Sequence, residues 1–205
     1  QSTNLPVLNP IQSNLRGPND LFIARFTPAH GLTWCTYYGG NGTEHTRRIA
    51  VDAQNNLMLT GWSDSQDFPV LNAGQATKNP GGSPEAWDLV ILQIDASHQT
   101  QWSTYFGGNG RDEPLGMDLF SNGDAVITGR TKSLDFPVQL PSPQLDPGSL
   151  SGGEDSFVML VDANGSIVQP FPPDAPSDLN AQVLSPTRIR LEWVDNSSNE
   201  SFFTL

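Results

Sequence analysis

Three acidic side chains follow glycine-rich turns, where they could carry acid–base or metal chemistry. Glu44 comes after Gly-Gly-Asn-Gly at 39–42, and Asp112 and Glu113 come after the same four residues at 107–110. Two carboxyl groups about 5 to 9 Å apart can hydrolyse a glycosidic bond, and carboxylates with backbone carbonyls bind Ca²⁺. The simpler interpretation is that a polar loop in an acidic protein carries acids. We therefore predict no catalytic residue and keep Glu44, Asp112 and Glu113 as candidate ligand-binding residues.

Other potential nucleophiles and metal ligands lie in turns and strands. His30 and His98 occupy similar turns, where solvated histidines are expected. Cys35 is the single cysteine, so no disulfide can form within the chain and a buried thiol is expected. Asp-Ala-Gln-Asn at 52–55 and Asp-Ala-Asn-Gly at 162–165 resemble the start of Ca²⁺ loops. They lack the spaced acids of an EF-hand, so Asx turns are predicted. We predict no cofactor and no bound metal, with Ca²⁺ as the alternative.

The chain contains an internal repeat with a period of 68 residues. Trp-Cys-Thr-Tyr-Tyr-Gly-Gly-Asn-Gly at 34–42 returns as Trp-Ser-Thr-Tyr-Phe-Gly-Gly-Asn-Gly at 102–110. Asp-Phe-Pro-Val at 67–70 returns at 135–138. A repeat of this length is one supersecondary unit, which must stack on its neighbours to bury its faces.

Trp62 and Trp87 differ from the other aromatic residues because they do not recur. At the repeat offset, Arg130 and Asp155 stand in their places. A tryptophan that the repeat does not require can be exposed and stack on a sugar ring, or it can pack incidentally. We keep Trp62 and Trp87 as candidate ligand-binding residues.

Each period predicts four short strands and a long polar connection. Apolar, β-branched and aromatic runs bounded by turn residues predict these strands: 20–27, 32–38, 48–52, 57–62, and in the second copy 117–120 and 125–129. This arrangement is typical of a β-propeller blade. A β-solenoid is the rival, although its coils are usually shorter than this period. The predicted fold class is all-β, with β-propeller-type four-stranded blades followed by a partial β-sandwich.

The repeats predict the organisation of the chain. The propeller-type region covers 1–169 and divides as follows: 1–19 partial, 20–87 full, 88–154 full, 155–169 partial. A closed propeller needs at least about four blades. We therefore expect that the chain is part of a longer protein, that several chains complete a ring, or that the array stays open.

Several motifs in fixed order give the chain a family resemblance. These are Trp-Ser-Thr-Tyr-x-Gly-Gly-x-Gly, a hairpin ending in Thr-Gly, and Asp-Phe-Pro, best seen at 102–110, 127–129 and 135–137. Over about residues 5–168 the chain resembles the bacterial seven-bladed β-propeller repeat, or SBBP repeat. His45 and Pro114 depart from the pattern of that family.

A different pattern follows residue 169. A proline-rich linker at 170–176 leads to predicted strands at 177–183 and 188–193, and the second strand alternates apolar and charged residues. The region 177–205 resembles the opening of a fibronectin type III domain, which implies that Trp193 is a core residue. Such a sandwich has seven strands, so this module is incomplete.

Composition narrows the classes of partner. The chain has 22 acidic and 10 basic residues and a net charge of −12, which disfavours nucleic acid and anionic membrane surfaces. No apolar run reaches the roughly 20 residues that span a bilayer. We expect a non-catalytic structural or adhesion scaffold of a secreted or surface bacterial protein, which associates with itself or with other surface proteins. It could form an oligomer or fibre. The alternative is a carbohydrate-binding or carbohydrate-active propeller that uses the candidate acids and tryptophans.

Overall fold

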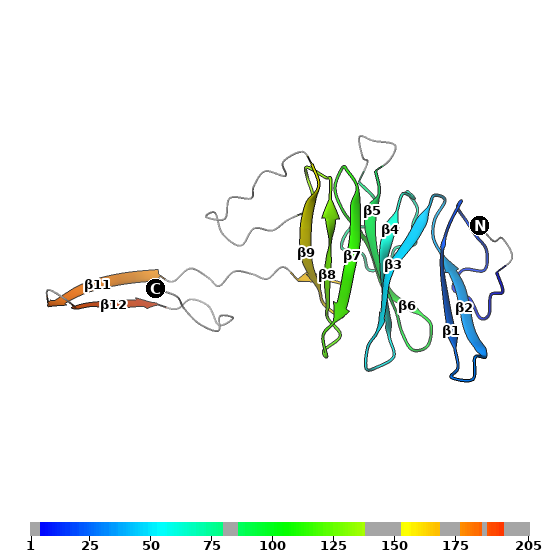
Figure 1. The fold of residues 1–205 in the computed structure, drawn as a ribbon, viewed down its shortest axis with the longest axis horizontal. Helices are drawn as coiled ribbons and strands as arrows, with labels where there is room; N and C mark the ends of the chain where they lie inside the picture. The colour runs from blue at the N-terminus through cyan, green and yellow to red at the C-terminus, as the bar shows by residue number, and fades with distance from the viewer. Residues whose placement is uncertain (1–4, 80–85, 138–152, 169–176, 186–187, 195–205) are drawn as a thin grey trace. The chain divides into compact units, whose positions relative to one another are not determined.

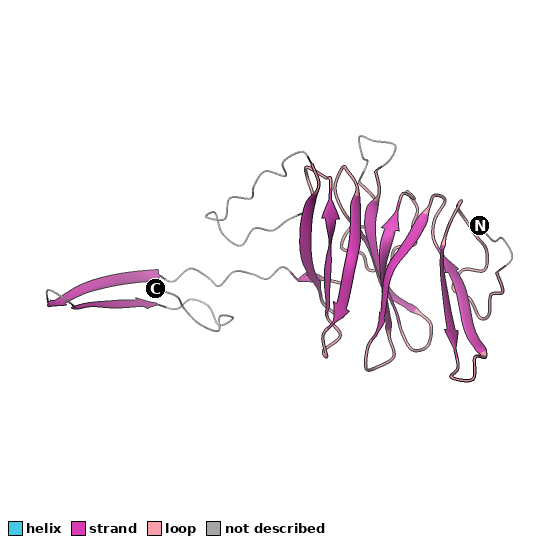
Figure 2. Ribbon diagram, in the orientation of Figure 1, coloured by secondary structure: helices cyan, strands magenta, loops and turns pink. Residues whose placement is uncertain are grey.

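The computed structural model describes residues 5–79, 86–137, 153–168, 177–185 and 188–194 (Figure 1). Within these ranges all regular structure is β and no helix occurs (Figure 2), so the all-β prediction is confirmed. The same ranges hold no helix long and apolar enough to cross a membrane. The chain divides into two compact units, 1–139 with 146–169, and 140–145 with 170–205.

The first unit contains three antiparallel sheets. The first sheet pairs β1 (Leu21–Phe26) with β2 (Leu32–Tyr38). The second sheet has the order β3-β4-β5-β6, formed by Glu44–Val51, Leu57–Ser63, Asp88–Ile94 and Thr100–Phe106. The third sheet has the order β10-β9-β8-β7, formed by Ile167–Val168, Asp155–Val161, Ala125–Thr131 and Asp112–Leu119.

The predicted strands occur where sequence placed them, but two begin earlier. The strand predicted at 48–52 starts at Glu44, and the one predicted at 117–120 starts at Asp112. In both cases the strand runs directly out of a glycine turn, so the candidate acids Glu44 and Asp112 are the first residues of β3 and β7. Strand propensity alone does not include them, because charged residues are depleted in strands.

Each full sheet crosses the boundary between two sequence repeats. The second sheet takes the β3-β4 hairpin from one copy of the repeat and the β5-β6 hairpin from the next. In this sheet β4 and β5 pair without interruption from Leu57 with Ile94 to Ser63 with Asp88. The third sheet joins β7-β8 to β9 in the same way, from Ala125 with Val161 to Thr131 with Asp155.

The second sheet lies between the other two and packs on both. Residues of β5 alternate between the two cores, which explains why all seven are buried. One face, called face A, carries Val90, Leu92 and Ile94, which pack against the first sheet. The opposite face, called face B, carries Leu89 and Ile91, which pack against the third sheet. A strand buried on both faces loses the usual polar alternation, as the sequence of β5 shows.

The second unit contains one described hairpin. Here β11 (Ser177–Ser185) pairs antiparallel with β12 (Arg188–Val194), with Ala181 opposite Leu191. Both strands were predicted, and each extends slightly beyond its predicted end. The remaining predicted parts, the linker at 170–176 and residues 195–205, lie outside the described residues.

Candidate functional site

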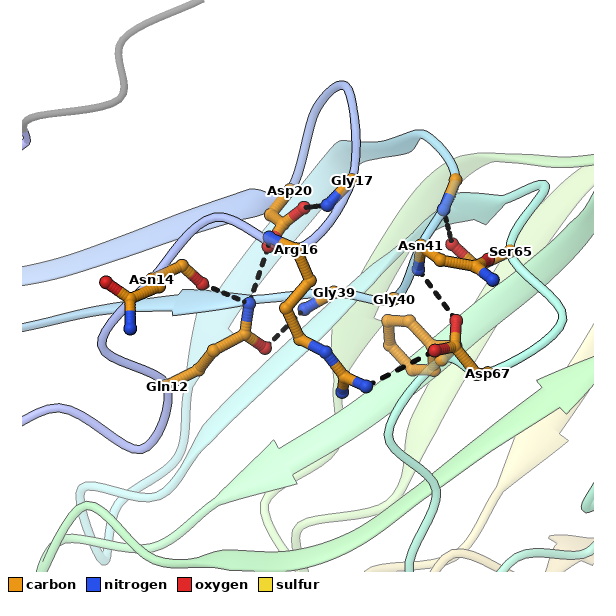
Figure 3. Close-up of polar contacts among 12 residues, drawn as sticks. Gln12, Asn14, Arg16, Gly17, Asp20, Gly39, Gly40, Asn41, Ser65 and Asp67 are labelled. Atoms are coloured by element: carbon orange, nitrogen blue, oxygen red, sulfur yellow. Dashed lines mark hydrogen bonds and ion pairs between the residues drawn. The ribbon is translucent and has the colours of Figure 1, made fainter.

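Side chains accept hydrogen bonds from every backbone N–H group of the first glycine turn. Figure 3 shows those from Gly39 to Gln12 and from Asn41 to Asp67. Five consecutive N–H groups, from residues 39 to 43, donate to polar side chains of the same unit. The acceptors, in chain order of the donors, are Gln12, Glu44, Asp67, Ser65 and Asp64. All five residues lie outside the turn, and four of them are 21 to 27 residues from their donors, so the turn brings distant segments to one end of the sheet.

The second glycine turn repeats this arrangement. The N–H groups of residues 107–110 donate, in order, to Gln75, Asp112, Asp135 and Ser133. Distances match between copies: Gly42 N to Ser65 Oγ and Gly110 N to Ser133 Oγ are both 2.7 Å. Four of the five hydrogen bonds repeat, and among them the bond to the recurring Asp before Phe-Pro shows that this residue holds the turn.

Glu44 acts as a pin for the first turn, by which we mean a buried carboxylate that accepts hydrogen bonds from the turn and from the end of the neighbouring strand. Its side chain accepts hydrogen bonds from Gly40 N at 3.1 Å, from Ser63 Oγ at 2.7 Å and from Ser65 Oγ. The residue is only 3% exposed. Burial raises the pKa of Glu44, because removal from water disfavours the charged carboxylate, and the hydroxyl bonds oppose that rise.

Asp112 plays the same part in the next copy. It accepts from Gly108 N at 2.8 Å, Thr131 Oγ1 at 2.5 Å and Ser133 Oγ at 2.7 Å. It is fully buried, and burial raises its pKa. Each acid is therefore surrounded by donors from its own turn and its own strand end. This geometry leaves neither carboxylate open to substrate or solvent.

Glu113 has different surroundings, although it is adjacent in sequence. Its side chain is 4% exposed and accepts from Arg130 Nη2 at 2.6 Å and from Arg47 Nη2. Arg47 lies on β3 and Glu113 on β7, so this ion pair joins the second sheet to the third. Removal of Glu113 would leave two guanidinium groups without their shared partner, and removal of either arginine would leave the buried carboxylate with only one.

Trp62 and Trp87 belong to a ladder of stacked side chains. Trp62 stacks on His45 with 4.4 Å between ring centroids, and on Trp87 with 4.6 Å. The guanidinium of Arg111 lies 4.4 Å from the centre of the Trp87 ring. These spacings follow the roughly 4.8 Å separation of neighbouring strands. Each indole thus has a neighbour on either side, and a sugar could stack only by displacing His45 or Arg111.

The third sheet places an ion ladder where the second sheet has this aromatic ladder. Glu113, Arg130 and Glu154 stand in the positions of His45, Trp62 and Trp87, and Arg130 Nη1 donates to Glu154 Oε1 at 2.8 Å. The strand register pairs Thr131 with Asp155 as it pairs Ser63 with Asp88. The counterpart of Trp87 is therefore Glu154 and not Asp155, because the second interval is one residue shorter.

A small polar hollow of about 120 Å³ lies where the two ladders meet. It is lined by Trp87, Arg111, Glu113, Arg130, Lys132 and Glu154. The structure therefore brings together Trp62, Trp87 and Glu113 but keeps Glu44 and Asp112 in separate turns. The sequence did not identify Arg111 and Arg130 as site residues, because their common location depends on pairing between strands of different repeats. Basic residues are few in this acidic chain, and that feature could have drawn attention to them.

The predicted turns behave largely as sequence suggested. Asp52 Oδ1 accepts from Gln54 N and Asn56 N, and Asp162 Oδ1 accepts from Asn164 N and Ser166 N. These are Asx-type turns, as predicted. In the described part of the chain, no group of three or more His, Cys, Asp or Glu side chains is arranged to hold a metal ion. Cys35 is buried, and burial raises the pKa of its thiol.

His30 and His98 have the same backbone conformation but different surroundings. Both have a left-handed φ, at 64° and 65°. His30 is exposed, as predicted, whereas His98 is half-buried and stacks on Trp34. The prediction that both are solvated is therefore wrong for His98, because the adjacent sheet brings an indole against its ring.

Comparison with known proteins gives one distant likeness. No protein-family model matches the chain. Over 153 residues, or 74% of the chain, it is 24% identical to the regulatory protein FlaEY of Caulobacter vibrioides. The chain spans 15% of the length of that protein. A likeness over so small a part of the relative does not carry the role of that whole protein to this chain.

Proposed function

We propose that the chain is a segment of a non-catalytic structural or adhesion scaffold, secreted or displayed at a bacterial surface, and built from propeller-type blades. The observation that supports this proposal most strongly is that the carboxylates of Glu44 and Asp112 are buried and accept hydrogen bonds from their own turns. A catalytic carboxyl group must reach substrate, whereas these two accept hydrogen bonds from three donors each while buried. The most regular acidic motif of the chain therefore serves the fold.

The packing of the sheets supports the propeller-type part of this proposal. Three sheets stack face to face in the first unit, and equivalent residues form both interfaces. This is the manner in which propeller blades pack. The resemblance to SBBP repeats and the fibronectin type III-like hairpin of the second unit support a surface or secreted location. One fold can host many unrelated functions, so the fold alone does not assign a partner.

Glycan binding is the second candidate function. The polar hollow beside Trp87 favours it, because guanidinium, ammonium and carboxylate groups can hydrogen-bond sugar hydroxyls around an aromatic wall. In that case Glu113 and Trp87 belong to the binding surface and Trp62 supports it by stacking on Trp87, whereas Glu44 and Asp112 do not belong to it.

A glycan array and a panel of chromogenic hydrolase substrates test the two candidates. The scaffold proposal expects no turnover from the wild-type chain. Turnover that disappears in Glu44→Gln or Asp112→Asn, with circular dichroism and thermal unfolding unchanged, would overturn it. Glycan binding that is lost in Glu113→Gln but kept in Asp118→Asn would favour the second candidate. Asp118 is a suitable control because it is an exposed acid on the same strand, β7.

A further inference from the structure

The three stacked sheets of the first unit leave two outer faces at least partly uncovered by described residues, and these faces are different from one another. The first sheet packs on the second through Leu21, Ile23, Trp34 and Tyr38. The second sheet packs on the third through the equivalent residues Leu89, Ile91, Trp102 and Phe106. Both interfaces therefore place face B of one sheet on face A of the next.

The other side of each interface repeats as well. Face A of the second sheet contributes Leu59, Val90, Leu92 and Ile94 to the core that it shares with the first sheet. Face A of the third sheet contributes Ile127, Phe157, Met159 and Val161 at the equivalent positions. The same packing of a face B on a face A therefore occurs twice in the molecule, with apolar side chains on both sides of each interface.

The outer side of the first sheet is a face A that is open along β1, whereas Tyr37 and Cys35 of β2, which pair with Phe22 and Ala24 on this face, are buried. Phe22, Ala24 and Phe26 occupy the positions that Val90, Leu92 and Ile94 hold in the second sheet, and Phe22 and Phe26 are 41% and 60% exposed. A separate apolar groove of about 210 Å³ lies between the first and second sheets, lined in part by Trp34 of the first and by Ile49, Val51, Leu57 and Ile94 of the second. The two exposed phenylalanines are therefore the apolar feature of the outer side, and neighbouring exposed apolar side chains are typical of an interaction surface.

The outer side of the third sheet is an uncovered face B. Val126 and Val158 occupy the positions of Met58 and Ile91, and Val158 is 72% exposed. The exposed residues Thr128 and Ser156 lie on the same face. Small and β-branched side chains make the part of this face around Val158 nearly level, so that it can receive the larger aromatic side chains of a face A. Arg130, which lies opposite Ser156, adds a charged side chain at the end of the same face.

We propose that two copies of this chain associate head to tail, with face B of the third sheet of one copy packed on face A of the first sheet of the next. The occupant is a second copy because its two outer faces continue an interface that the molecule already uses twice. Such a contact is heterologous, so it closes into a ring or grows into a filament. The inference rests on the proposed scaffold function and names the surface through which that scaffold would assemble.

Charge modulates this association in a predictable direction. Each copy carries a net charge of −12, so two copies repel one another at low ionic strength. Salt screens that repulsion and strengthens apolar contacts. We therefore expect sedimentation velocity and light scattering to show larger species as protein concentration and salt increase.

Two variants test the direction of the contact. Phe22→Thr/Phe26→Thr removes the apolar side chains of face A while keeping residues that favour strands, and Val158→Arg places a charge on face B. Each variant alone should associate at least about tenfold more weakly than wild type. Leu134→Arg is the matched control, because Leu134 is 63% exposed and lies in the turn after β8, so it belongs to the strands of neither face.

Mixing the two variants gives the decisive measurement. Each retains the face that the other lacks, so an equimolar mixture should form a dimer that cannot grow further. Self-association of either single variant at the wild-type level would overturn the proposal, as would a mixture that stays monomeric. A wild-type chain that remains monomeric at high concentration and salt would also overturn it and assign the faces to other repeats. None of these outcomes depends on glycan binding or turnover, which test the proposed function separately.

Discussion

Trp34 and His98 lie flat against one another across the boundary between the first and second sheets. Their ring centroids are 4.6 Å apart and their planes differ by 7°. Burial lowers the pKa of His98, with the charge of Arg25 as a second cause, and the Nε2 atom of His98 is buried without a hydrogen-bond partner. The contact therefore favours the neutral imidazole.

Acidification should weaken the molecule through this contact. The stability that neutral His98 contributes is complete above the ordinary pKa of 6.5, and it is lost as pH falls through the lower pKa of the folded state. His98→Asn removes the titration and keeps the turn, since Asn55 adopts φ 65° at the matching position of the turn between β3 and β4. Urea unfolding at several pH values should show that the wild type loses more free energy of unfolding below pH 6.5 than His98→Asn. His30→Asn, a change in an exposed equivalent turn, should leave the wild-type pH profile in place; equal profiles for wild type and His98→Asn would contradict the prediction.

Removal of the Asp112 pin should destabilise the first unit. Asp112→Ala leaves Gly108 N–H and two hydroxyl groups without their buried acceptor, which should cost roughly 2 to 4 kcal/mol. Asp112→Asn should cost less, because the Thr131 hydroxyl can turn and accept from the new amide. Denaturant titration followed by circular dichroism measures both. If Asp112→Ala unfolded with the same midpoint as Asp118→Asn, the pin would carry no energy.

Asp88 should give stability a pH dependence opposite to that of His98. Burial raises the pKa of Asp88 to about 7, and its Oδ1 atom is buried without a hydrogen-bond partner. A raised acid pKa means that the folded state binds the proton more tightly, so the contribution is complete below the ordinary pKa of 3.8 and declines as pH rises to about 7. Asp88→Asn should flatten this decline without abolishing it, because Glu44 and Asp112 act in the same direction. An unchanged slope in Asp88→Asn would show that Asp88 ionises normally.

The stacked pair Trp62 and Trp87 should have a spectroscopic signature. Two indoles with centroids 4.6 Å apart couple their electronic transitions, which gives a paired positive and negative band in the far-ultraviolet circular dichroism spectrum. Trp62→Phe and Trp87→Phe should each remove this pair of bands. Trp193→Phe should retain it, because Trp193 belongs to β12 in the second unit. Persistence of the bands in both single variants would place their origin elsewhere.

The all-β class and the positions of the strands were largely predictable, because their signals are local. Turn residues bound each strand, and apolar runs identify the strands of the repeat, so hairpins such as Leu57–Ser63 with its partner were located within a few residues. Which strands of successive repeats form one sheet was not predictable. A periodic sequence has the same pattern wherever the period is taken to start, and only the pairing of Leu57 with Ile94 shows that a sheet begins at Glu44.

The candidate site was only partly predictable for a related reason. Glu44 and Asp112 were found because they follow a conspicuous turn, but their role as pins depends on hydroxyl groups about 20 residues away in the chain. The stacking of Trp62 on Trp87 depends on strand register and on the course of the long connection between them. Neither of these is encoded in local composition.

The offset between repeats and sheets has a consequence for how the molecule can be divided or shortened. A cut between Trp87 and Asp88 follows the sequence period but tears the second sheet between its two central strands, exposing the apolar ladder of β4 and β5. A cut within a glycine turn passes between sheets and leaves each one whole. Deletion or duplication of a segment bounded by these turns would therefore remove or add a complete sheet, so the turns mark the natural joints for rearrangement of the gene.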